Sequence, residues 1–134
     1  MPRQLFVNLP VKDLDRSVKF FTALGFEFNP QFTDENATCM IIGQDCYAML
    51  LVEKYFATFT DKPIADASKG AEVINAIGLD SREEVDAMGD KALASGGSPF
   101  AEPKDYGFMY QRSFQDPDGH LWEVFHMSGE PPAG

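Results

Sequence analysis

Apolar positions in the first half of the chain recur with two periods, that of a strand and that of a helix. Residues 4–11 are mostly apolar and predict a strand with a kink or an edge at Pro10. The next apolar positions recur at helical spacing, with Asp13 or Asp15 as a plausible N-cap and Gly25 as a natural C-cap. The stripe of this helix comprises Leu14, Val18, Phe21 and Leu24.

Shorter alternating runs follow this helix. Residues 26–28 predict a short strand, and residues 38–42 and 47–52 predict a hairpin around a Gly-Gln-Asp turn at 43–45. The first half therefore predicts one strand, one helix and three further strands.

The second half repeats this order after a polar, poorly patterned connector at residues 57–71. Residues 72–79 predict a strand, Asp80-Ser81 caps a helix that Gly89 weakens, and a Ser-Gly-Gly stop follows at 95–97. The expected apolar stripe of this helix comprises Val85, Met88 and Leu93. A short strand at 100–101 and strands at 107–114 and 120–127 complete the set, the last two joined by a DPDG turn.

Taken together, the order of elements is an internal repeat of about 68 residues, although the two halves share few identical residues. It predicts an α+β fold of two βαβββ modules whose strands form a cupped mixed sheet. Within a single domain spanning 1–134, we expect module one at about 1–56, the connector at 57–71, module two at about 72–128 and a tail at 129–134. A small-molecule site is expected in the cleft between modules.

Composition narrows the class of partner. Hydrophobic residues make up 44% of the 134 residues and include 12 Phe, which is ample for a core or a lined cavity. The net charge of −10 opposes binding to nucleic acid or to an anionic membrane surface. The sequence contains no run of about 18 apolar residues, so it predicts no membrane-spanning helix. The N-terminal residues lack the apolar core of a signal peptide, and we therefore expect a cytoplasmic protein.

Two cysteines, Cys39 and Cys46, flank the turn of the first hairpin. They could face each other across it, but reduced thiols in a cytosolic protein are the reading we favour.

Two motifs carry a resemblance to a known family. The opening FVNLPVKDLDRSVKFFTALGF and the closing FQDPDGHLWEV are similar to those of the vicinal-oxygen-chelate superfamily, which includes glyoxalases, extradiol dioxygenases, and bleomycin and fosfomycin resistance proteins. The opening matches lie at Val11, Asp13, Leu14, Arg16, Ser17, Phe20, Phe21, Leu24, Gly25 and Phe26. The resemblance implies paired βαβββ modules, usually in a homodimer, with a cupped sheet around the site.

The same resemblance implies where a metal would bind. Its last ligand position falls on Glu123, but the positions at the start of each module fall on Phe6 and Ile74, and the one late in module one falls near Leu51. Apolar side chains cannot bind a divalent ion, and one carboxylate is too few for a catalytic site. Glu72 could replace Ile74 only if the register slipped. We therefore expect no cofactor, with a divalent metal as the alternative.

Strand alternation separates both histidines from Glu123. If Glu123 lies inward with Leu121 and Phe125, then His120 and His126 point the other way, onto a helix. Both imidazoles are then packed or surface side chains rather than ligands.

Five residues remain as candidates for the site. Glu123 could act as a base on a carbon acid or as a polar contact to a ligand. Tyr110 and Arg112 share one face of their strand, with Met109, Gln111 and Ser113 on the other, and the sequence leaves open which face is inward. If inward, Arg112 could pair with Glu123 or an anionic ligand. Asn8 shares a face with Phe6, and Glu53 is either a site residue or the solvated end of a strand.

Three functions follow from these candidates. The one we favour is a metal-free protein that binds a small, partly hydrophobic molecule. The alternatives are a metal-dependent lyase or dioxygenase of the same superfamily, and a metal-independent isomerase with Glu123 as its base.

Overall fold

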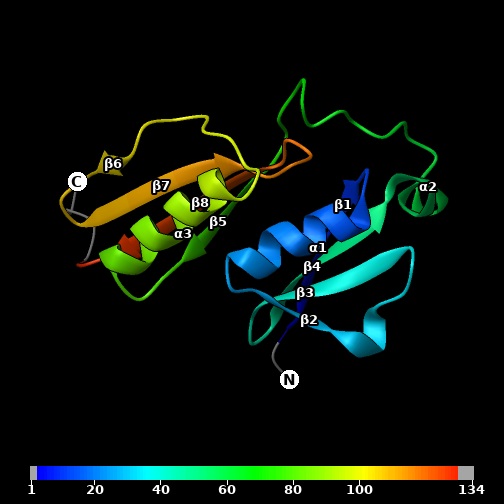
Figure 1. The fold of residues 1–134 in the computed structure, drawn as a ribbon, viewed down its shortest axis with the longest axis horizontal. Helices are drawn as coiled ribbons and strands as arrows, with labels where there is room; N and C mark the ends of the chain where they lie inside the picture. Colours follow the sequence, from blue (N-terminus) through cyan, green and yellow to red (C-terminus); the bar gives the residue numbers. More distant parts are fainter. Residues whose placement is uncertain (1–2, 130–134) are drawn as a thin grey trace. The chain divides into compact units, whose positions relative to one another are not determined.

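The computed structural model describes residues 3–129, and the fold it shows is two βαβββ modules (Figure 1). The elements of module one are β1 (Leu5–Val11), α1 (Leu14–Ala23), β2 (Glu27–Asn29), η1 (Pro30–Phe32), β3 (Ala37–Gly43), β4 (Cys46–Val52), α2 (Glu53–Phe56) and η2 (Ala57–Phe59). Those of module two are β5 (Ile74–Gly78), α3 (Arg82–Ala94), β6 (Lys104–Asp105), β7 (Met109–Gln115) and β8 (Leu121–Met127). The chain divides into two compact units between Asp66 and Ala67.

The two sheets have the same topology. Their strand orders are β1-β4-β3-β2 and β5-β8-β7-β6, so the first strand of each module lies beside its last. That pairing is parallel in both modules, whereas the other neighbours are antiparallel. The predicted α+β class and the duplicated βαβββ order are confirmed.

The core of module one lies between α1 and one face of its sheet. Asp13 is the N-cap of α1, and its side chain accepts a hydrogen bond from the Arg16 backbone N–H. Phe20 and Phe21 are almost fully buried and contact each other edge to face at 5.0 Å. Alternation places Leu50 and Met40 on the sheet face that meets this helix, and both are fully buried.

The core of module two differs from the sequence expectation. Val85 is buried as expected, but Leu93 is 40% exposed, and the other buried positions of α3 are Gly89 and Ala92. The expected stripe was therefore wrong at Leu93, because the helix turns small residues toward β7 and leaves room for large side chains of the sheet. Trp122 and Val124 of β8 are among these buried sheet residues.

The DPDG turn is organised by a buried aspartate. Asp116 is only 4% exposed, and its carboxylate accepts hydrogen bonds from the backbone N–H of Asp118, the backbone N–H of His120 and the indole N–H of Trp122. Burial raises the pKa of Asp116, and these bonds act against that rise. Gly119 has φ 91°, and a side chain there would also approach the Ala67 backbone to 3.0 Å, so the turn requires glycine.

Several expected boundaries shift. The strand expected at 72–79 spans Ile74–Gly78, and the short strand expected at 100–101 lies instead at Lys104–Asp105. Most of the expected tail, residues 130–134, lies outside the described residues.

The two cysteines do not face each other. Cys39 pairs across the hairpin with Met49 and Cys46 with Gly43, and both thiols are free. Burial raises the pKa of the Cys39 thiol.

Within residues 3–129, no helix combines the length and the apolar character that a bilayer crossing requires.

Candidate functional site

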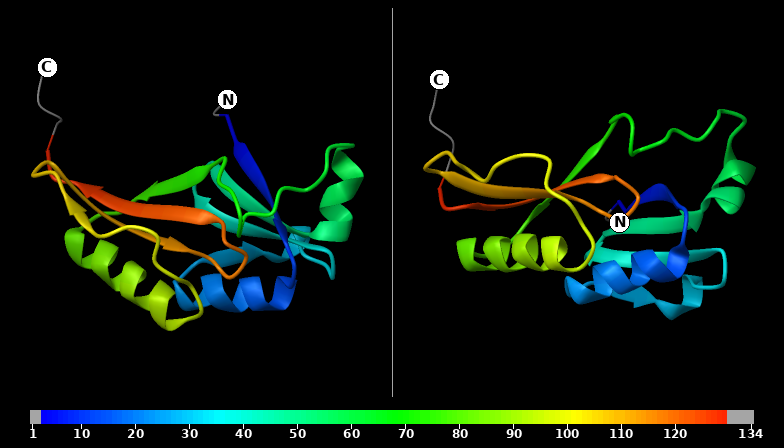
Figure 2. Two further views of the ribbon diagram at one scale, coloured as in Figure 1. Left: turned by 90° about the horizontal axis from the view of Figure 1, so that it is seen from above. Right: turned by 45° about the horizontal axis from the view of Figure 1, so that its top comes forward.

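Each sheet has one face against its long helix and one opposite face, which we call the open face. In module two, α3 runs along one side of the sheet in both views of Figure 2. Buried Trp122 and Val124 mark the helix face, so alternation places Glu123 on the open face. The register then assigns the rest of the open face in the centre of the sheet: Ile74, Ala76, Gly78, Gln111, Ser113, Gln115, Leu121 and Phe125.

Glu123 lies at the middle of this open face and is half-buried. Its neighbours in register are the short side chains of Ala76 on β5 and Ser113 on β7. One carboxylate oxygen, Oε2, accepts a long hydrogen bond of 3.5 Å from the Gln111 side-chain amide. Among the described residues, Gln111 is thus the hydrogen-bond donor to the candidate carboxylate.

Tyr110 and Arg112 are not brought together with Glu123. They share the helix face of β7, where the Arg112 guanidinium donates to the carboxylates of Asp86 and Asp90, both at 3.0 Å. The sequence left open which face of this strand is inward, and the structure places Arg112 on the helix face, where it pairs with two carboxylates of α3 and not with Glu123.

These contacts also shift pKa values. The hydrogen bond from the Tyr110 hydroxyl, at 2.6 Å, holds the pKa of Asp86 below its usual value, with Arg112 as a further cause. The same bond raises the pKa of Tyr110. Burial lowers the pKa of Arg112, but its bonds to Asp90 and Asp86 outweigh that and leave it raised. The group as a whole ties β7 to α3.

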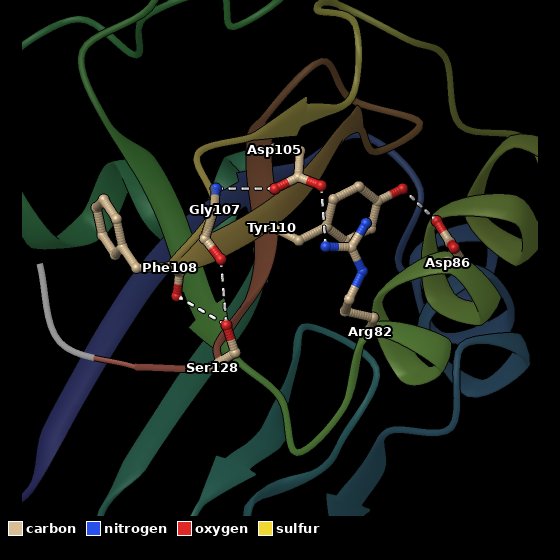
Figure 3. Close-up of polar contacts among 7 residues, drawn as sticks. All are labelled: Arg82, Asp86, Asp105, Gly107, Phe108, Tyr110 and Ser128. Atoms are coloured by element: carbon tan, nitrogen blue, oxygen red, sulfur yellow. Dashed lines mark hydrogen bonds and ion pairs between the residues drawn. The ribbon is translucent and has the colours of Figure 1, made fainter.

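A second cation extends this group to the loop before β7. Arg82 lies over the Tyr110 ring, 4.2 Å from its centre, and pairs with Asp105 at 3.0 Å (Figure 3). Asp105 also accepts from the Gly107 backbone N–H, which lowers its pKa together with Arg82. Ser128 closes the arrangement by donating to the Gly107 carbonyl. All of these contacts fix the shape of the module, and none involves the open face.

The open face of module one carries an aromatic pair. Phe6 stacks on Tyr47 with ring centres 4.7 Å apart and planes 16° apart, and Phe6 remains 42% exposed. Asn8 is exposed on the same face, and its amide donates to the Phe6 carbonyl at 3.4 Å. This backbone contact is the local role that an asparagine in a strand often has.

Glu53 does not end a strand. It opens helix α2 directly after β4, so the alternation that would have placed it on the face of Leu51 stops at Val52. The expected strand position of Glu53 is therefore wrong, and its side chain is half-buried.

Pairing registers test the metal positions implied by the sequence resemblance. Ala76 pairs with Glu123 in module two, and the equivalent pairing in module one joins Asn8 to Met49, so Met49 rather than Leu51 is the counterpart of Glu123. The four implied positions do not fit a divalent ion that prefers nitrogen and oxygen ligands. They hold the apolar side chains of Phe6 and Ile74, the thioether of Met49 and one carboxylate, that of Glu123. Among residues 3–129, no three His, Cys, Asp or Glu side chains group closely enough to hold a metal.

His126 lies on the face of β8 opposite Glu123, as alternation predicted, whereas His120 lies before the strand begins. His126 pairs with Tyr110 on the helix face, and its Nδ1 lies 3.0 Å from the Leu79 carbonyl oxygen. His120 precedes β8 in the DPDG turn, where its backbone N–H is bound by Asp116.

Comparisons with known proteins agree with this architecture. Residues 3–43 match a family model described as the N-terminal part of bleomycin resistance-like proteins. No curated protein matches the chain.

Solved structures match over nearly the whole chain. A hypothetical protein from S. aureus is 29% identical, with a TM-score of 0.80 and 94% of each chain covered. A glyoxalase/bleomycin resistance protein/dioxygenase from Nocardioides is 25% identical, with a TM-score of 0.72, covering 99% of this chain and 89% of that one. A bleomycin resistance determinant encoded on the transposon Tn5 is 19% identical, with a TM-score of 0.65, covering 96% of this chain and all 100% of that one.

The duplicated βαβββ modules give this chain the fold of these solved structures, several of which are described as glyoxalase/bleomycin resistance protein/dioxygenase family members. Its N-terminal residues 3–43 are also similar to those of bleomycin resistance-like proteins, so by fold and by N-terminal sequence the chain resembles the vicinal-oxygen-chelate superfamily.

Proposed function

We propose that this protein binds a small, partly hydrophobic molecule on the open face of module two, without a complete metal site, and that Glu123 is the polar anchor for this molecule. One observation carries the proposal: a single half-buried carboxylate stands among apolar side chains at the positions where metal enzymes of the superfamily have ligands.

Exposed apolar side chains on the open faces support binding of a partly hydrophobic molecule. Ile74 is 50% exposed and Met127 of β8 is 48% exposed in module two, and Phe6 is 42% exposed in module one. Covering such side chains is favourable by about 25 cal/mol for each Å² of apolar surface removed from water. The polar position on the open face of module two, Glu123, would orient a ligand rather than supply most of its affinity.

One named neighbour is described as a bleomycin resistance determinant, with no reaction named. It supports a binding protein over an enzyme only as an analogy between members of one fold. The residues Phe6, Ile74 and Met49 carry more weight, because they oppose the metal chemistry of a lyase or a dioxygenase directly.

Metal binding separates these functions. The protein, purified without chelator, is expected to contain less than a stoichiometric amount of metal and to gain none when titrated with Ni²⁺, Zn²⁺, Mn²⁺ or Fe²⁺. Stoichiometric binding that disappears in Glu123→Gln would contradict the proposal and favour the lyase or dioxygenase.

A further inference from the structure

The carboxylate of Glu123 has no cation beside it in the described part of the chain. The ion pairs of module two that join Arg82 to Asp105 and Arg112 to Asp86 and Asp90 do not include Glu123. Lys104 shares the open face but stands on β6, two strands from β8, with Gln111 between them. At the usual strand spacing, the two backbones are about 10 Å apart.

Gln111 alone is a weak partner for this charge. Its amide donates to Oε2 at 3.5 Å, at the long end of hydrogen bonding, and no other hydrogen bond to the Glu123 side chain is present among the described residues. A partly exposed carboxylate with so few protein partners keeps acceptor positions that a cation can occupy with charge-assisted hydrogen bonds.

An apolar ring borders the carboxylate on the same face. Phe125 is two residues along β8 from Glu123, and its ring lies against Gly78 of the neighbouring strand, where a Cβ would come within 3.2 Å of it. Gly78 therefore lets the ring lie over the edge strand. On one side of Glu123, Ala76 is short and exposed, so the carboxylate is accessible there. On the other side, Ser113 is buried and its hydroxyl donates to the Ala101 carbonyl at 3.5 Å.

We infer that the open face of module two selects an organic cation, a protonated amidine or amine attached to a flat apolar body. The cation would pair with Glu123 while the body lies beside Phe125, and Gln111 is a positioning residue that holds Oε2 and leaves Oε1 toward the ligand. This inference rests on the proposed binding function and names the class of its ligand.

Two physical features favour this class over a neutral ligand. An amidinium or ammonium group can donate a charge-assisted hydrogen bond to the Glu123 carboxylate, and such a bond is about twice as strong as one from a neutral alcohol or amide. The net charge of −10 attracts cations to the protein as a whole, although it does not select this face.

Benzamidine and benzamide make a matched pair of probes, because they have the same size and shape and differ in charge. Each is titrated into ¹⁵N-labelled protein while backbone amide shifts are followed. Benzamidine is expected to shift the amides of Ala76, Ser113 and Glu123 and to bind at least about tenfold more tightly than benzamide, the ratio for one charge-assisted hydrogen bond.

Three variants assign the effect to side chains. Glu123→Gln keeps the shape, and it is expected to remove the preference for benzamidine. Gln111→Leu is expected to weaken benzamidine severalfold while part of the preference remains. The control Glu53→Gln removes a half-buried carboxylate elsewhere in the chain and is expected to bind as wild type does. An unchanged spectrum away from the substituted position shows that each variant is folded.

Each outcome decides the inference. Equal binding of both probes on the open face overturns the cation preference and leaves the proposed binding function standing. Three other results also overturn the cation preference. They are benzamidine binding that survives in Glu123→Gln, amide shifts confined to the helix face, and no amide shifts up to about 10 mM benzamidine. Failure of the proposed function itself has a separate signature, stoichiometric metal bound through Glu123.

Discussion

Gly89 stands in the middle of helix α3, where a glycine ordinarily costs about 1 kcal/mol relative to alanine. A Cβ at this position would lie 2.9 Å from Cζ and 3.0 Å from Nε of Arg112. The guanidinium therefore occupies the space that the missing side chain leaves. Because its ends are held by Asp86 and Asp90, it cannot move aside without losing these bonds.

Gly89→Ala should therefore have two opposing effects. Helix propensity adds about 1 kcal/mol of stability. Displacement of Arg112 removes two charge-assisted hydrogen bonds, which we take as about 1 to 2 kcal/mol together, because the side chains of Asp86 and Asp90 are 50% and 74% exposed. The net change in wild type is expected between zero and about 1 kcal/mol of destabilisation.

A double-mutant cycle isolates the contact. Without the guanidinium, in an Arg112→Ala background, Gly89→Ala is expected to stabilise by about 1 kcal/mol. The coupling between the two positions is then about 1 to 2 kcal/mol, well above the error of about 0.3 to 0.5 kcal/mol for independent sites. Urea unfolding of the four proteins, followed by far-UV circular dichroism, measures it. Equal stabilisation by Gly89→Ala in both backgrounds would refute the steric reasoning.

Two further predictions concern buried or paired carboxylates. Near pH 7, Tyr110→Phe should lower the free energy of unfolding by about 1 kcal/mol. The lowered pKa of Asp86 contributes stability that is lost as the pH falls through that pKa, so the difference from wild type should shrink near pH 3. A difference in urea unfolding that is independent of pH would contradict this. Asp116→Asn should destabilise the protein by about 1 to 2 kcal/mol, because an amide offers one acceptor oxygen in place of two and leaves the Trp122 indole N–H without its acceptor. Unchanged stability in urea, with unchanged Trp fluorescence, would argue against the Asp116 carboxylate as the acceptor that holds Trp122.

Much of the fold could be predicted from the chain because its signals are local. Asp13 and Gly25 mark the ends of the first helix region, DPDG marks a turn, and the order of elements repeats. Alternation along β8 also separated Glu123 from His126 correctly, since a strand with buried Trp122 and Val124 has an unambiguous helix face.

Other features depend on partners far away in sequence. Strand 109–115 carries polar and apolar residues on both faces, so its pattern could not show that Arg112 meets α3. Gly89 looked like a weakness of its helix, although it is the space for that guanidinium. Glu53 was assigned to a strand because nothing local marks the change from β4 to α2, and its helix has no side-chain cap.

Gln111 was placed on a strand face but not selected for the site. The only signal available was its alternation with Arg112, which becomes informative once the helix face is known. A hydrogen bond between side chains on neighbouring strands, such as that from Gln111 to Glu123, depends on pairing register, and single-sequence patterns do not specify it.

Metal stoichiometry tests the central claim most directly. Wild type, Glu123→Gln and the control Glu53→Gln are purified without chelator, assayed for bound metal by mass spectrometry, and titrated calorimetrically with Ni²⁺, Zn²⁺, Mn²⁺ and, under anaerobic conditions, Fe²⁺. Because Phe6, Ile74 and Met49 supply none of the ligands such ions prefer, all three proteins are expected to hold far less than one metal per chain and to give the same weak response. One tightly bound metal per chain in wild type and in Glu53→Gln, lost in Glu123→Gln, would contradict the account.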